Sequence, residues 1–176
     1  MPYNPKDASA LLRRARELVE PEVTIRDARV SKKYIEFDTS IPDSIDVSTI
    51  IERLEAISPL GSYEHVIEHH MEKDKAIKRA MQLFNDERYW EAHEALESVW
   101  KNASGIEKDI LNGIILAAAA FVHDEKDEPS VCLSILRRAR KKLGGASGTY
   151  HGMDVNRIKD KISEIITSGK INRFTI

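Results

Sequence analysis

The strongest constraint on the fold is the helical periodicity that fills the chain from residue 71 to its end. Apolar residues recur there every three or four positions, which is the spacing of an amphipathic helix. The breaks between these segments are short and rich in residues that end helices, as in the glycine-rich run at 144–148. The pattern predicts five helices, at residues 72–85, 88–102, 106–124, 129–143 and 154–168. Because short connections force neighbouring helices to pack antiparallel, residues 71–176 are predicted to form a helical bundle.

Residues 1–70 follow a different pattern, in which runs of β-branched and aromatic residues alternate with helical segments. The predicted elements are a helix at 6–20, strands at 23–30 and 34–37, a helix that begins at Asp46 or Ser48 and ends before Ser58, and a third strand at 63–67. The order helix, strand, strand, helix, strand predicts a small α+β domain. We therefore expect an α+β N-terminal unit, residues 1–70, followed by an all-α helical bundle, residues 71–176, and a chain that is mostly helical overall.

Composition excludes several classes of protein. The longest apolar run, Ile114 to Val122, is nine residues, whereas a membrane-spanning helix needs about 20. Met1 to Glu20 is charged and lacks the apolar stretch of a secretion signal. The single cysteine, Cys132, excludes an internal disulfide and a multi-thiolate zinc site. The net charge of −2 gives the chain no overall positive potential that would attract nucleic acid. We expect a cytoplasmic protein without a membrane or nucleic-acid partner.

One predicted helix, residues 88–102, combines an apolar face with a row of polar side chains. Tyr89, Leu96 and Trp100 fall on the apolar face, while His93 and Glu97, one turn apart, lie together at its edge. Glu94 lies further round the helix and Glu91 on another flank, and Asn112 and His123 share a stripe of the following helix. The candidate polar cluster comprises Tyr89, Glu91, His93, Glu94, Glu97, Trp100, Asn112 and His123.

Three interpretations of this cluster stay open. In the first, His93 and Glu97 hydrogen-bond to each other and brace the packing of two helices. In the second, His93 is a general acid or base oriented by Glu94 or Glu97, with Tyr89 or His123 assisting. In the third, His93, Glu97 and His123 bind a metal ion. Helical zinc and di-iron sites repeat Glu-x-x-His or His-Glu-x-x-His, and the chain has no Glu-x-x-His, so we expect no metal and no cofactor.

A second histidine pattern, His65-Val66-Ile67-Glu68-His69, has the spacing of a metallopeptidase motif. That motif needs a helix, so that both histidines share one face. Here the pattern follows Gly61-Ser62 and is predicted to end a strand or to form the linker. In a strand the two histidines stand about 13 Å apart, too far to share an ion. The sequence therefore does not predict a metal site there.

The segment from Leu83 to Trp100 carries a distinctive motif. It contains Phe84-Asn85, Tyr89, Glu91-Ala92-His93-Glu94, Leu96, Glu97 and Trp100. This order resembles the signature of the all-helical family known as domain of unknown function 309. The resemblance covers about residues 75–168 and continues through Asp109–Ile115, the alanine run 117–120, His123 and Tyr150–Asp154. The family usually has glutamine where this chain has Leu116, and often where it has Asn112. The resemblance implies a short helical array, and the family has no established activity.

Two functions remain for such a bundle. Arg88–Ala92 followed by Leu96 is similar to the second half of a tetratricopeptide-type helix pair, and such pairs present a surface to partner proteins. With two tryptophans on one short helix, this favours a helical binding or scaffolding module with a protein partner or a homo-oligomeric state. The alternative is a small, hydrolase-like enzyme that uses His93 with Glu94 or Glu97, with or without a metal ion.

Overall fold

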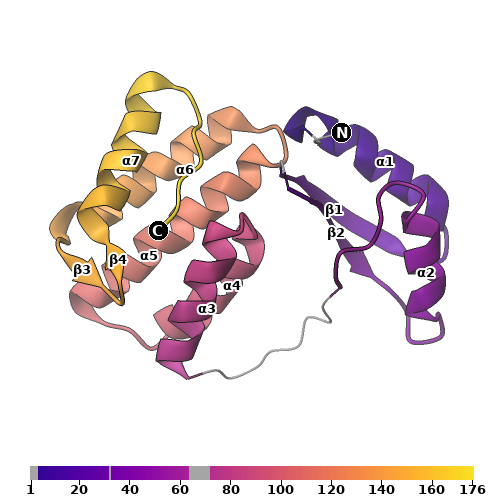
Figure 1. The fold of residues 1–176 in the computed structure, drawn as a ribbon, viewed down its shortest axis with the longest axis horizontal. Helices are drawn as coiled ribbons and strands as arrows, with labels where there is room; N and C mark the ends of the chain where they lie inside the picture. The colour runs from indigo at the N-terminus through magenta and orange to yellow at the C-terminus, as the bar shows by residue number, and fades with distance from the viewer. Residues whose placement is uncertain (1–3, 32, 64–71) are drawn as a thin grey trace. The chain divides into compact units, whose positions relative to one another are not determined.

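The computed structural model describes residues 4–31, 33–63 and 72–176. Its contacts divide the chain into two compact units, Met1–Glu68 with Glu125–Asp127, and His69–Asp124 with Glu128–Ile176 (Figure 1). The domain boundary predicted between residues 70 and 71 lies outside the described residues. The same holds for most of the third strand predicted at 63–67 and for the His65–His69 pattern.

The first unit combines helices with a two-stranded sheet, in agreement with the predicted α+β class. Its elements are η1 (Pro5–Asp7), α1 (Ala8–Val19), β1 (Thr24–Val30), β2 (Ile35–Ser40) and α2 (Val47–Leu54). The two strands pair antiparallel, with Val30 opposite Ile35 beside the turn. Ser31 stabilises this turn, because its hydroxyl accepts hydrogen bonds from the backbone N–H groups of Lys33 and Tyr34.

A small apolar core joins the elements of this unit. Ala15 from α1, Ile25 from β1 and Ile50 from α2 are all buried in it. The predicted helix start at Asp46 is confirmed, since its side chain accepts a hydrogen bond from the backbone N–H of Ser48. Such caps satisfy one of the free N–H groups of the first helical turn.

The second unit is a helical bundle, as the periodicity predicts. Its elements are α3 (Lys73–Asn85), α4 (Tyr89–Trp100), α5 (Gly105–Asp124), α6 (Pro129–Lys142), η2 (Leu143–Gly145), β3 (Thr149–Tyr150), β4 (Met153–Asp154) and α7 (Val155–Ser168). Every predicted helix is present, and each of the helices α3 to α6 packs against the next helix in the chain. Across the described residues, the structure contains no helix with both the length and the apolar character needed to cross a membrane.

α5 lies in the middle of this bundle and is buried along most of its length. Gly113 allows the closest approach, because a Cβ atom at this position would lie 2.5 Å from Cγ of Leu143. Leu143 is itself fully buried. The glycine therefore leaves the space that a large core side chain fills.

After α7 the chain reverses and its last residues fold back onto the bundle (Figure 1). Gly169 ends the helix with a left-handed conformation, φ 68°, which glycine adopts without strain. Phe174 then packs against the core. The helical periodicity stops at residue 168 and does not predict this docked tail.

Candidate functional site

The Leu83–Trp100 motif, called the α4 motif below, begins at the end of α3, and its first half holds the C-terminal tail. The side-chain amide of Asn85 donates to the backbone carbonyl of Ile176 at 3.1 Å and accepts from its N–H at 2.8 Å. Arg173 donates to Glu87 Oε2 at 2.7 Å and, through two nitrogens, to Asp124 Oδ2 at 2.8 and 3.0 Å. The asparagine of the motif thus has a structural partner far away in the sequence.

Aromatic rings complete this docking. Tyr89 lies with Phe84 and Phe121 in one cluster, with ring centroids 4.9–5.9 Å apart, and Phe174 of the tail joins it. Tyr89 is 1% exposed, so the structure places it in the core and out of reach of a substrate. Of the candidate residues on α4, Tyr89 therefore serves packing.

Glu91 is paired with Arg88, the residue just before α4. The guanidinium of Arg88 donates to both carboxylate oxygens of Glu91, at 2.6 and 2.5 Å. This bidentate ion pair occupies the hydrogen-bonding atoms of the first turn of α4. The polar side chains that are open to further partners lie further along the helix.

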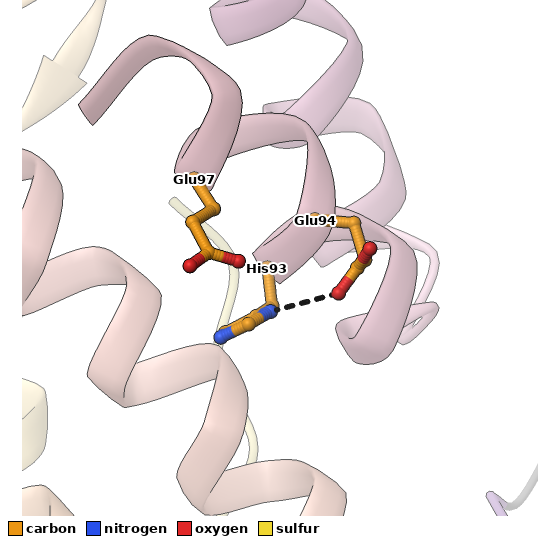
Figure 2. A group of neighbouring side chains, drawn as sticks. All are labelled: His93, Glu94 and Glu97. Carbon is orange, nitrogen blue, oxygen red and sulfur yellow. Dashed lines mark ion pairs between the residues drawn. The ribbon is translucent and has the colours of Figure 1, made fainter. Parts of the chain in front are cut away.

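His93, Glu94 and Glu97 come together on one side of α4 (Figure 2). One potential ligand atom from each residue lies within 4.8 Å of the others. The imidazole lies between the two carboxylates, and its Nδ1 is 3.6 Å from Glu94 Oε1. The His93 and Glu94 side chains are 21% and 46% exposed. The group therefore borders solvent and is not sealed in the core.

Stacking holds the imidazole of His93 in place, but one of its two nitrogens lacks a hydrogen bond. Trp90 stacks on it, with centroids 5.4 Å apart and an interplanar angle of 14°. Its Nδ1 is buried and has no hydrogen-bond partner among the described residues. The hydrogen bond that the bracing interpretation requires between His93 and Glu97 is not formed in the structure. Instead the nearest acidic atom to Nδ1 belongs to Glu94.

Comparison with protein families identifies the helical segment. Residues 77–135, which run from α3 into α6, match the family described as domain of unknown function (DUF309). Residues 77–135 are a DUF309 segment. A crystal structure of a conserved hypothetical protein from Thermus thermophilus is 31% identical, over 51% of this chain and 94% of that one, with a TM-score of 0.46. A search of curated proteins finds no significant match.

The family match includes the whole α4 motif and therefore the His93 group. It ends before β3, so the resemblance proposed through residue 168 is confirmed for 77–135. The family description states no activity for the group.

Two predicted members of the cluster lie on α5 and do not join the group. His123, near the end of α5, has its Nδ1 2.5 Å from Glu128 Oε2. The potential ligand atoms that converge on α4 do not include His123. Asn112 is half-buried and forms no hydrogen bond with α4 among the described residues. The metal site suggested for His93, Glu97 and His123 is therefore not assembled in this geometry.

Trp100 lies one turn beyond Glu97 on the same side of α4. Its indole ring is half-buried against the core, and its Nε1 is buried without an acceptor among the described residues. Lys108 of α5 places its ammonium 4.8 Å from the ring centroid, a cation–π contact. Sequence periodicity placed Trp100 on the apolar face but could not show that its N–H lacks a partner.

A separate polar cluster lies around Glu107 at the start of α5. Lys73 Nζ is 2.5 Å from Glu107 Oε1, which also accepts a hydrogen bond from Tyr150 at 2.9 Å. The hydrogen bond from Lys73 lowers the pKa of Glu107. Burial, together with the bond to Glu107, raises the pKa of Tyr150. These groups satisfy one another, which is the behaviour of a structural network.

Proposed function

We propose that this DUF309 domain is a helical binding module and that one side of α4 is its binding surface. This surface, the α4 ridge, comprises Trp90, His93, Glu94, Glu97 and Trp100. The observation that carries the proposal is the pair of tryptophans on this side of α4, Trp90 and Trp100, which pack against the core and stay half-exposed. Tryptophan is enriched at interfaces because its large ring has an apolar body and a polar edge.

Half-buried aromatic side chains are the residues that anchor protein interfaces, because they provide a large contact area with little loss of conformational freedom. Trp90 and Trp100 both fit this description, since each packs partly against the core. A partner that covers the ridge would bury the apolar surface that the two rings leave exposed.

The charges of the ridge favour a second copy of the chain as the partner. Glu94 and Glu97 lie in the middle of α4, whereas Lys101 follows its end and Lys108 lies above Trp100. A two-fold axis perpendicular to α4 would pair the helix antiparallel with its copy and bring the same patch together from both copies. Antiparallel α4 helices would therefore set the acidic residues of one copy opposite the lysines of the other. We infer a homodimer paired through α4.

Light scattering coupled to size exclusion tests this inference on the full chain. The wild type is expected to be dimeric at high micromolar concentration. Glu94→Lys should shift it to monomer, because it places like charges together, and the double variant Glu94→Lys/Lys101→Glu should restore the dimer. Glu164→Lys on α7 is the matched control and should change nothing. A monomeric wild type, or a dimer indifferent to Glu94→Lys, would refute the pairing.

A small hydrolase is the second candidate. The observation in its favour is a partly exposed imidazole with a carboxylate oxygen 3.6 Å from Nδ1, an arrangement suited to general base chemistry. It ranks second because a cavity of about 330 Å³ lies elsewhere, between α7 and the tail, and its lining includes no residue of the ridge. Comparing the wild type with His93→Gln in a screen of ester and phosphoester substrates tests it. Equal activities would exclude this role for His93.

A further inference from the structure

We propose that a cleft between α7 and the C-terminal tail binds a small phosphate monoester. This tail cleft has a volume of about 330 Å³ and is lined by Arg157, Lys161, Glu164 and Ile165 of α7 and by Asn172–Thr175 of the tail. Its volume is at the lower end of the range of ligand pockets, about 300–1,000 Å³. No lining residue belongs to the α4 ridge, so the inference goes beyond the proposed dimer and does not depend on it.

The charges that line the tail cleft favour an anion. Arg157 and Lys161 are four residues apart on α7, so they lie on the same face of the helix, one turn apart. A third cation, Arg173, lines the cleft from the tail but is already compensated by the two carboxylates that anchor it. Among the described lining residues, Glu164 is the one acidic side chain. The two cations of α7 are therefore the groups that would bind a ligand.

Neither of these cations is fully used by a partner within the protein. A guanidinium has five N–H donors, and among the described residues the Arg157 side chain makes one hydrogen bond, 3.4 Å long, to the hydroxyl of Thr175. Lys161 pairs with Glu164 at 3.0 Å, but the two side chains are 45% and 57% exposed. Exposed ion pairs contribute little to stability. The ammonium of Lys161 can therefore turn toward an anion in the cleft at small cost.

The pair of cations selects a phosphate monoester over a carboxylate. A guanidinium can bind two oxygens of one anion through its planar fork, and an ammonium adds a point charge. A phosphate monoester carries about −1.5 to −2 charges at pH 7 and can satisfy both groups, whereas a carboxylate carries a single charge. Half-buried Phe174 adds an apolar wall to the cleft. Because a bare phosphate ion would leave this wall uncovered, we expect an organic group on the ester.

The tail contributes a wall that is fixed before a ligand arrives. Asn172 and Thr175 are exposed and add an amide and a hydroxyl, both of which can donate hydrogen bonds to phosphate oxygens. Between them, Arg173 anchors the tail to the bundle through two hydrogen bonds to Asp124. A wall held in this way lowers the entropic cost of binding.

Calorimetric titration of the full chain with phenyl phosphate, inorganic phosphate and benzoate tests the proposal. We expect one phenyl phosphate to bind per chain, more tightly than inorganic phosphate because the ring covers the apolar wall. Benzoate retains the ring but carries one charge, and it should bind at least about 10-fold more weakly than phenyl phosphate. The proposal would be overturned if phenyl phosphate did not bind at millimolar concentration, or if either of the other probes bound as tightly.

Variants locate the binding site. Arg157→Met and Lys161→Met should each weaken the binding of phenyl phosphate by at least about 10-fold, whereas Glu164→Gln should strengthen it, because it releases Lys161. Arg138→Met on α6 is the matched control, since Arg138 is exposed and lies outside the cleft, and its loss changes the net charge equally. Circular dichroism on each variant separates lost binding from lost folding. If Arg138→Met lowers the affinity as much as Arg157→Met, the anion binds by overall charge and the tail cleft is not its site.

Discussion

Replacing Arg173 by methionine tests whether the C-terminal tail is part of the folded bundle. The guanidinium donates three hydrogen bonds, one to Glu87 and two to Asp124. It also lies 5.7 Å from the centroid of the Tyr89 ring. Methionine retains most of the apolar length of the side chain and removes only its charge and donors. The variant therefore isolates the ionic anchor of the tail.

The expected loss follows from burial. Arg173 is 13% exposed, and its partners Glu87 and Asp124 are 18% and 19% exposed. Breaking a fully buried pair costs about 3–5 kcal/mol, because it leaves an uncompensated charge, whereas an exposed pair contributes about 0–1 kcal/mol. A network that is mostly but not fully buried lies between these limits. We expect Arg173→Met to lower the free energy of unfolding by about 2–3 kcal/mol.

Urea unfolding followed by tryptophan fluorescence measures this loss in the relevant unit, because both tryptophans, Trp90 and Trp100, belong to the bundle. Arg157→Met is the matched control, since that arginine reaches the same tail through one 3.4 Å hydrogen bond to Thr175. It should cost less than about 0.5 kcal/mol, as exposed contacts do. If the two variants lose the same stability, the tail is not anchored by Arg173 as we argue.

Three further predictions concern the bundle. Gly113→Ala should destabilise it by about 1–2 kcal/mol, because the clash with Leu143 outweighs the higher helix propensity of alanine; a stabilised variant in urea unfolding would contradict this packing. Burial raises the pKa of Cys132 to about 12, so a thiol reagent at pH 8 should label it only after denaturant is added, and rapid labelling of the native protein would disprove its burial. The lowered pKa of Glu107 means that its pairing with Lys73 stabilises the fold above the ordinary glutamate value of 4.5 and is lost as the pH falls further. Stability measured between pH 6 and 3 should therefore drop less in Glu107→Gln than in the wild type, and parallel curves would argue against the pairing.

The helices were predictable because the residues that specify each helix lie within that helix or at its ends. An apolar period of 3.6 residues continues through each segment, and the breaks contain residues that disfavour helix, so α3 to α7 could be placed from sequence. The docked tail could not be placed in this way. Its eight residues have no periodicity, and their contacts with Asn85 and Phe84 join positions about 90 residues apart. Only the packed bundle brings those positions together.

The candidate site was predictable in part for a similar reason. Helical spacing alone puts His93 and Glu97 on one side of α4, but it places Glu94 further round. The carboxylate of Glu94 reaches back to Nδ1 through its side-chain rotamer, which sequence does not specify. His123 shows the opposite error. It was grouped with Asn112 by their common stripe on α5, yet its partner Glu128 comes from the loop that follows the helix. The partner of a polar side chain depends on its rotamer and on nearby loop residues, and helical periodicity specifies neither.

The family motif therefore has two halves with different physical roles, and Arg173→Met separates them. Phe84, Asn85 and Tyr89 hold the tail, whereas His93, Glu94 and Glu97 converge on a partly exposed side of α4. Tyr89 and Glu97 are eight residues apart, about 12 Å along the helix axis. If the halves are independent, loosening the tail should lower stability and leave the dimer dissociation constant within about two-fold of the wild type. Joint loss of stability and dimerisation, in a variant that still shows the helical circular dichroism of the wild type, would mean that the tail positions the ridge and that the motif is a single functional unit.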